Sequence, residues 1–322
     1  MQQFEALGNQ DELARPTPVG ARLSAAALKR VLEDHRAWLS GSERGLRATL
    51  NGIVLAEAMI EKLNLERADL KSANFIDARM SGINLSGAVL QYADLGNATL
   101  VDADLSRADL MDAKLDFALL AAANLSEARL LRTSFRRANL RAARMLEAAM
   151  EESNFTGAVL KEACLNQARA VDCDFSEADF TAAQLYHALF RSCRMAGISA
   201  AGSNWRTAIL QNCEFRLADM PGAHFDRADL SRSSFFRANL KGSTLDGARM
   251  SGADLSRADL SEARLAEAAM MGADLRHANL YRAQGLTPAQ LGQARTDRDT
   301  ILPNGSHGPF MLGSGAHRPG RV

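Results

Sequence analysis

Large apolar residues recur at every fifth position along most of the chain. From Leu50 to Leu280, one unbroken register carries Leu, Met, Phe, Ile or Trp, except at Ala170 and Ala200. The residue two places before each of these is most often Ala, and otherwise mainly Ser, Thr or Cys. A period of five matches neither the α-helix nor the simple strand, so the pattern excludes both.

This pattern instead predicts a square coil. The small residue, the next residue and the large residue alternate in, out, in, as in a short strand. The two residues that follow, often Ser, Arg, Gly or Glu, turn the chain. Four such corners close a coil of about 20 residues, and stacked coils hydrogen-bond to one another at about 4.8 Å spacing. A lumen this narrow admits one large and one small side chain per side, which explains the alanines.

Residues 20 apart should therefore lie in one column. Two inward columns are of interest, one of cysteines and one of phenylalanines: Cys173, Cys193 and Cys213, and Phe135, Phe155 and Phe175. Residues ten apart should face each other across the lumen. The undersized Ala170 and Ala200 then lie opposite Phe180 and Phe190, as close packing requires.

The segment 103–110, Ala-Asp-Leu-Ser-Arg-Ala-Asp-Leu, resembles the pentapeptide repeat family, whose consensus is Ala-Asp/Asn-Leu followed by two variable residues. The resemblance covers about 230 of 322 residues. It implies an all-β solenoid, a right-handed quadrilateral β-helix of about 12 coils, which at 4.8 Å per coil would be roughly 55 to 60 Å long. It says little about function, because most members of the family are uncharacterised.

Both ends of an open β-solenoid need caps, because its terminal edges carry unpaired backbone groups. We expect a flexible N-terminus over 1–23 and a capping helix with its linker over 24–47. The helix itself should span 25–40 and stop at Gly41; binding a partner is the alternative to capping. The β-helix should cover 48–283. A C-terminal cap over 284–303 should hold a short helix that starts with a capping box at Thr287–Gln290, before a disordered tail over 304–322.

Composition narrows the classes of function. Lys plus Arg and Asp plus Glu balance at 38 each, which argues against direct nucleic-acid binding. No run of about 18 apolar residues is present, so no membrane span is expected. The N-terminus lacks the features of a signal peptide, and a cytoplasmic location follows. Four cysteines in a chain of this length do not suggest a disulfide scaffold.

No catalytic, cofactor or metal site is predicted, and we expect no enzyme. A straight ladder of inward cysteines supplies neither the tetrahedral geometry nor the fourth ligand that zinc needs. The six histidines are scattered, and column positions assemble no Cys-His or Ser-His-Asp grouping. Six arginines between Arg129 and Arg144 fall within one coil. They predict an anion-binding band or ion pairs with acidic residues of adjoining coils, such as Asp112 and Asp116, and we favour ion pairs.

The candidate functional residues are apolar ones that point outward. Leu189 and Ile209 should stack on one side of the coil, with Tyr186 on the neighbouring edge, and such a patch can mark an interface. The leading hypothesis is a bacterial, non-enzymatic scaffold or adaptor for a protein partner. One alternative is a modulator of DNA gyrase, because some members of the family protect gyrase by resembling DNA. The other is a structural protein that self-associates, for example as a homodimer through an end or an apolar side.

Overall fold

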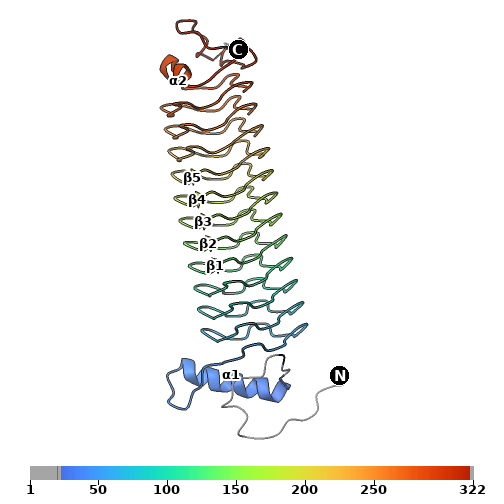
Figure 1. The fold of residues 1–322 in the computed structure, drawn as a ribbon. Helices are drawn as coiled ribbons and strands as arrows, with labels where there is room; N and C mark the ends of the chain where they lie inside the picture. Colours follow the sequence, from blue (N-terminus) through green and yellow to red (C-terminus); the bar gives the residue numbers. More distant parts are fainter. Residues whose placement is uncertain (1–19, 21–22, 320–322) are drawn as a thin grey trace. The chain divides into compact units, whose positions relative to one another are not determined.

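The structure, a computed structural model, describes residue 20 and residues 23–319. The expected flexible segment 1–23 lies almost wholly outside the described residues. Spatial proximity divides the chain into two compact units, the first ending at Ala149 and the second beginning at Met150. Within each unit the chain winds through stacked coils (Figure 1), which confirms the predicted all-β solenoid. Each coil of a solenoid contacts only its neighbours, so such a division needs no break in the repeat.

Parallel bridges join residues that are 20 positions apart. In the first unit Val54 pairs with Asn74, where the Leu55 N–H donates to the Asn74 carbonyl at 2.8 Å. In the second unit Asp174 pairs with Arg194, and Arg194 pairs with Glu214. The predicted 20-residue coil is therefore confirmed in both units.

Five short strands recur at intervals of 20 residues in the part of the chain that the structure describes. Their bounds are β1 Arg129–Leu131, β2 Ala149–Glu151, β3 Arg169–Val171, β4 Leu189–Arg191 and β5 Ile209–Gln211. Strand β4 pairs in parallel with both β3 and β5, so Arg169, Leu189 and Ile209 form one outward column. The central residue of each of these three strands is buried in the lumen, as the in-out alternation predicts.

Every corner of the repeat uses the same backbone conformation. From Gly52 to Arg282, every fifth residue has a positive φ, and most of these residues are not glycine. The turn closes with a bond such as that from the Ala58 N–H to the Leu55 carbonyl, at 3.1 Å. An Asp or Asn before the large residue often accepts the N–H two positions on, as Asn84 does from Ser86 at 3.0 Å. The recurrence of Asp and Asn thus has a structural cause at the turns.

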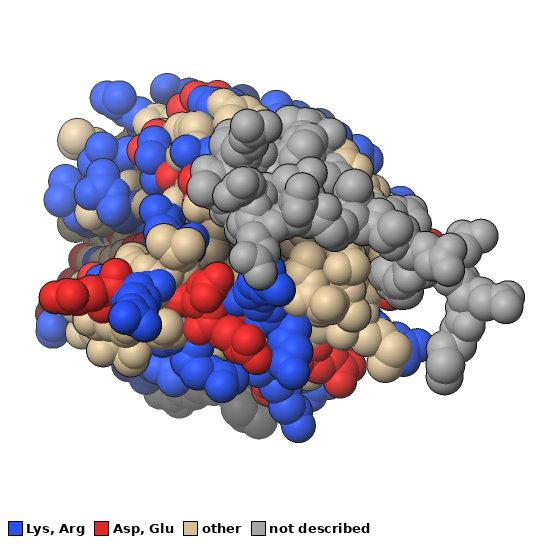
Figure 2. Space-filling view, turned by 90° about the horizontal axis from the view of Figure 1, so that it is seen from below, with Lys and Arg blue, Asp and Glu red and all other residues tan. Residues whose placement is uncertain are grey.

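The N-terminal cap is helix α1, Ala25–Leu39. Ser24 caps it by accepting the Ala27 N–H at 3.1 Å, and Gly41 follows its end with a φ of 79°. The buried His35 ties the helix to the first coil, because its Nδ1 accepts the Ala48 N–H at 3.1 Å. Viewed from this end, Lys and Arg side chains are interspersed with Asp and Glu (Figure 2).

The C-terminal cap contains helix α2, Pro288–Gln293. The predicted capping box is present between Thr287 and Gln290. Gln290 also donates from Nε2 to the carbonyls of Leu265 and Ala268, at 2.9 and 3.0 Å, and so satisfies acceptors at the end of the repeat. Within the described residues, no helix is long and apolar enough to cross a membrane.

The expectation of a disordered tail over 304–322 is wrong for residues 304–319, which take defined positions. The Gly308 N–H donates to the Thr300 carbonyl at 2.7 Å, and Ile301 forms an antiparallel bridge with His307. Ala316 is buried, with 4% of its surface exposed. Composition suggested disorder because these residues lack periodicity, but backbone hydrogen bonds hold them against the cap.

Candidate partner-binding surface

The two apolar residues predicted to stack lie on β4 and β5. Leu189 and Ile209 are direct partners in the parallel register, and both are half-buried. The Leu189 N–H donates to the Ala168 carbonyl at 2.8 Å, and the Ile209 N–H donates to the Ala188 carbonyl at 2.9 Å. Because the ladder fixes their backbones, the two side chains form a preorganised apolar pair on the outside of the coil.

Tyr186 lies on the preceding corner and is separate from this pair. Its side chain is 42% exposed, and its ring contacts the His187 ring edge-on, with centroids 3.9 Å apart. It borders an open hollow of about 370 Å³ that is also lined by Arg206, Thr207, Asp226, Arg227 and Asp246. The structure thus brings Leu189 and Ile209 together and places Tyr186 in the adjoining hollow.

The charges in this hollow are fixed by neighbouring groups. Arg206 Nε lies 2.9 Å from Asp226 Oδ2, which also accepts the Thr244 hydroxyl at 2.7 Å. Burial opposes ionisation of Asp226, but these hydrogen bonds outweigh it and hold the pKa of the carboxyl below its ordinary value. The hollow therefore presents an ionised, oriented pair to any partner at neutral pH.

A second open hollow adjoins the apolar pair on the other edge. Asp229 bridges to Ile209 one coil on, and it accepts the Ser231 N–H at 3.0 Å and Gln211 Nε2 at 2.8 Å. Burial opposes ionisation of Asp229 as well, yet the hydrogen bonds from Ser231 and Gln211 lower the pKa of this carboxyl. Arg232 and Arg249 also line this hollow. An apolar pair between two polar hollows is the arrangement of an interface with a dry centre and a polar rim.

One hydroxyl near this surface lies beside an imidazole. Thr207 Oγ1 is 2.9 Å from His187 Nδ1, but it also lies 2.5 Å from the Arg206 carbonyl, to which it donates. The hydroxyl thus has two polar neighbours, and its contact with the carbonyl is the shorter of the two.

The predicted inward ladders are buried. Cys173, Cys193 and Cys213 are at most 1% exposed, and all are free thiols. The adjacent Cys193 thiol and burial raise the pKa of Cys173, so that it does not ionise at neutral pH. Phe135 is buried in the first unit. In the second unit the rings of Phe155 and Phe175 stack with centroids 4.8 Å apart.

The arginines between Arg129 and Arg144 are partly paired within the first unit. Arg132 Nε lies 2.7 Å from Asp112 Oδ1, and Arg129 Nη1 lies 3.6 Å from Asp109 Oδ2. Asp116 instead accepts the backbone N–H of Arg136 at 3.1 Å. These contacts favour the ion-pair interpretation for Arg129 and Arg132, which are each 20 residues beyond their aspartates.

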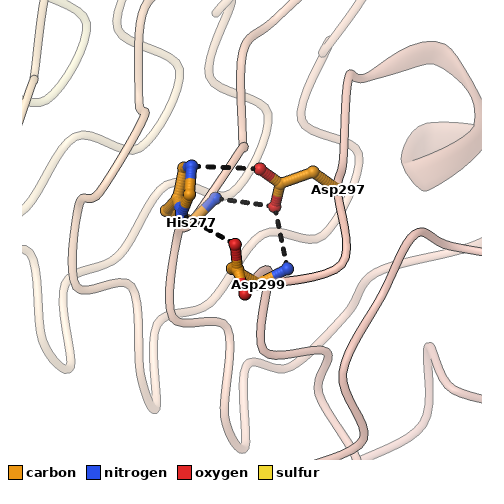
Figure 3. Close-up of side chains that lie close together, drawn as sticks. All are labelled: His277, Asp297 and Asp299. Atoms are coloured by element: carbon orange, nitrogen blue, oxygen red, sulfur yellow. Dashed lines mark hydrogen bonds and ion pairs between the residues drawn. The ribbon is translucent and has the colours of Figure 1, made fainter.

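Sequence reasoning missed a cluster where the C-terminal cap meets the repeat (Figure 3). His277 Nε2 lies 3.2 Å from Asp297 Oδ2, and His277 Nδ1 lies 3.4 Å from Asp299 Oδ2. Asp297 Oδ1 accepts the His277 N–H at 3.0 Å. Burial opposes ionisation of Asp297, but the hydrogen bonds from the His277 N–H and the Thr300 hydroxyl lower the pKa of this carboxyl. Asp297 follows His277 by 20 residues, so column positions extended past the repeat would have found the pair.

One imidazole and two carboxylates are ligand types that divalent metals accept. Both ring nitrogens of His277, however, already face carboxylate oxygens. Arg298 Nε also lies 3.6 Å from Asp299 Oδ2, which adds a competing cation. We interpret the cluster as a clamp that fastens the cap to the last coil of the repeat.

Comparison with solved structures finds other pentapeptide repeat proteins. HetL, a protein involved in heterocyst differentiation regulation from the cyanobacterium Nostoc sp. strain PCC 7120, is 24% identical, with 89% of this chain and 100% of HetL covered and a TM-score of 0.34. QnrB1, a plasmid-mediated fluoroquinolone resistance protein, is 19% identical over 59% of this chain and 89% of its own, with a TM-score of 0.27. A protein from the Arabidopsis thaliana thylakoid lumen is 29% identical over 30% of this chain and 63% of its own, with a TM-score of 0.25. No curated protein matches the chain. TM-scores this low give no argument about function.

The coils, the alanine-lined lumen and the outward ladders define a repeat protein of the quadrilateral β-helix class. The profile described as Pentapeptide repeats (8 copies) matches overlapping segments from 48–87 to 253–284, which together cover most of the chain. The chain therefore belongs to the pentapeptide repeat family.

Proposed function

We propose that this chain is a non-enzymatic adaptor that binds a protein partner through a rigid β-helical surface. The observation that carries the proposal is the apolar pair Leu189 and Ile209, held by the ladder between two hollows of fixed charge. Tyr186, 42% exposed at the edge of one hollow, would add an amphipathic contact. Family membership also supports a repeat protein without catalytic activity.

We propose that the chain binds its partner in the cytoplasm. All four cysteines are free thiols, as is usual in a reducing compartment. The balanced formal charge supports a protein partner over direct binding of nucleic acid.

The test is affinity purification of the full chain from its native cell, followed by mass spectrometry. The double variant Leu189→Ser/Ile209→Ser should lose the partner. Val159→Ser is the control, because Val159 is apolar, half-buried and outward in the second unit but lies ten positions out of phase with the pair, on the opposite side of the coil. A partner retained by the control and lost by the first variant supports the proposal, and direct titration with the purified partner should reproduce the loss. A set of captured proteins that is identical for all three chains contradicts it.

A second hypothesis is modulation of DNA gyrase, which rests on family membership and on the fluoroquinolone resistance named for QnrB1. The net formal charge of zero does not favour a mimic of DNA. A supercoiling assay with and without a quinolone distinguishes the hypotheses: no effect at micromolar protein removes this one.

Self-association is the remaining alternative. Met59 and Leu119, which are exposed and occupy the same column of the first unit, would support it through a side of the coil. Light scattering of the purified chain over a range of concentrations would reveal a dimer, and a monomer throughout would eliminate this option.

A further inference from the structure

A corner of the second unit carries a ridge of basic and apolar side chains that the adaptor proposal does not use. The basic ridge consists of Arg216, Leu217, Phe236, Arg237 and Arg257. Arg216 and Arg237 each place their guanidinium carbon 5.3 Å from the centroid of the Phe236 ring. Contact with the ring limits the motion of both guanidinium groups, so the two side chains lose less conformational entropy when they bind a ligand.

A second feature of the ridge is that its arginines are not ion-paired to any described residue. Among the described residues, Arg216, Arg237 and Arg257 have no carboxylate within ion-pair distance. The flanking aspartates accept hydrogen bonds from other donors. Asp219 accepts Asn239 Nδ2 at 2.8 Å, and Asp259 accepts the Ser261 N–H at 2.9 Å.

The same holds for the aspartate on the other side of the corner. Asp254 accepts the N–H and the hydroxyl of Ser256, at 3.0 and 2.5 Å. By contrast, Arg276, the next arginine along this corner, forms an ion pair with Asp274, in which Nη2 and Oδ2 are 2.6 Å apart. The unpaired part of the ridge therefore ends before the C-terminal cap.

The spacing of the ridge suits an extended chain. The Leu217 N–H donates to the Phe236 carbonyl, and the Arg237 N–H donates to the Ser256 carbonyl, so the three arginines lie on successive coils. At about 4.8 Å per coil they span about 10 Å. Alternate residues of an extended peptide point the same way about every 6.8 Å, so two carboxylates can reach the three guanidinium groups. Leu217, 62% exposed, offers apolar contact beside them.

We propose that the basic ridge binds an extended acidic segment of a partner protein. Glutamate or aspartate carboxylates pair with Arg216, Arg237 and Arg257, and an apolar side chain of the segment packs on Leu217 and Phe236. Three arginines are too few to neutralise many phosphates, and the exposed leucine favours a peptide over nucleic acid. The ridge begins at the residues just after Phe215 and Phe235, whereas the Tyr186 hollow begins just after Leu185 and Trp205. The two sets of positions differ by ten residues, which is half of a coil. It therefore lies on the opposite corner and is a second binding surface.

The experiment measures the fluorescence anisotropy of a fluorescein-labelled peptide with glutamate at alternate positions and one central phenylalanine. The full chain is titrated at low and at physiological salt. Arg216→Glu/Arg237→Glu should weaken binding by about tenfold or more. Lys161→Glu/Lys241→Glu is the matched control, with the same change of charge on another corner of the second unit and outside both hollows, and should change the dissociation constant less than about twofold. Leu217→Ser, which leaves the charge unchanged, should weaken binding by a smaller factor.

Three outcomes would overturn the proposal. The wild-type chain could fail to bind the peptide at millimolar concentration. The two charge-reversal variants could weaken binding equally, which would mean that binding follows net charge and not the ridge. A labelled single strand of deoxythymidine could bind more tightly than the peptide and be lost in Arg216→Glu/Arg237→Glu, which would make the ridge a nucleic-acid site. Thermal unfolding by circular dichroism confirms that each variant is folded.

Discussion

At the scale of single residues, the lumen shows why one small position is serine and not alanine. Trp205 is fully buried, with the rings of Phe180 and Phe225 at 5.6 and 6.1 Å. Its indole N–H donates to Ser203 Oγ at 2.6 Å, and that hydroxyl donates to the Ala200 carbonyl at 2.6 Å. A buried indole needs such a partner. The undersized Ala200 and the serine together accommodate the largest side chain of the core.

Ser203→Ala should therefore destabilise the chain by about 1–3 kcal/mol, because it leaves the indole N–H buried without an acceptor. Ser243 is the matched control: it occupies the equivalent small position, but its buried hydroxyl has no partner. Ser243→Ala should be neutral or slightly stabilising, since no hydrogen bond is lost. Urea unfolding of both variants checks the contrast. Equal losses would show that the indole bond contributes nothing specific.

At the scale of the elements, the corners store conformational strain. A positive φ is costly for residues with a Cβ, and the repeat adopts it at every fifth residue. Glycine removes this cost where it occurs, as at Gly222, which has a φ of 66°. A Cβ added there would meet nothing within 4 Å, so a substitution at this corner tests backbone strain alone.

Gly222→Val should destabilise the chain by about 1–2 kcal/mol, because a β-branched residue tolerates the left-handed region poorly. Gly222→Asn should have a much smaller effect, since asparagine enters this region readily. The midpoint of thermal unfolding measures both. If valine and asparagine have the same effect, strain in the left-handed region does not limit the stability of this corner.

The N-terminal cap depends on a neutral histidine. His35 is fully buried in α1, and its Nε2 has no hydrogen-bond partner. Burial lowers the pKa of His35; nearby Arg47 also lowers it, whereas the backbone and the charge of Glu66 raise it. Its Nδ1 must stay unprotonated to accept the Ala48 N–H. Attachment of α1 to the first coil is thus coupled to pH.

Because the folded-state pKa of His35 lies below the unfolded value, the unfolded chain binds more protons in the interval between them. Stability from this site should be fully present above about pH 6.5 and should fall as the pH drops below it. Hydrogen exchange at the Ala48 amide should accelerate at pH 5 beyond the intrinsic effect of pH. His35→Phe should exchange faster at pH 8 but show no such extra acceleration. A wild-type amide equally protected at pH 8 and pH 5 contradicts the coupling.

Much of this architecture can be predicted from the sequence, because each five-residue unit meets the same local constraint. The in-out alternation and the 20-residue column follow from the period alone, and both helices lie within a residue or two of their predicted bounds. The C-terminal segment could not be predicted in this way. There the register shifts: the 20-residue rule still joins His277 to Asp297, but Asp274 pairs with Arg295 and Asn279 with Ile301, at separations of 21 and 22 that the repeat does not predict. The hollows also depend on rotamers that periodicity does not specify.

At the scale of the whole molecule, ionised aspartates recur as acceptors at the corners and on the sides. Asp174 shows their common environment, accepting the Ser176 N–H at 2.9 Å and Arg194 Nε at 3.1 Å. Burial opposes its ionisation, yet these hydrogen bonds prevail and lower its pKa. At Asp112 and Asp274 the hydrogen bond from an arginine is the main cause of a lowered carboxyl pKa. Because the motif repeats, protonation should weaken many turns together.

The whole chain should therefore be sensitive to acid below the ordinary range of aspartate titration. A carboxyl whose pKa is lower in the folded state than in the unfolded state stabilises the fold at pH values above its unfolded-state pKa, which is about 3.9. This stabilisation is lost as the pH falls through the folded-state pKa. Urea unfolding should show stability declining between about pH 4 and pH 2. Asp174→Asn tests one turn, because Asn154 in the neighbouring coil already accepts the Thr156 N–H at 2.9 Å in the same way. This variant should keep its turn and show a shallower decline in acid. If Asp174→Asn shows the same decline in acid as the wild type, Asp174 does not contribute to that decline. If the stability of the wild type is unchanged down to pH 2, the aspartate turns do not depend on ionised carboxylates.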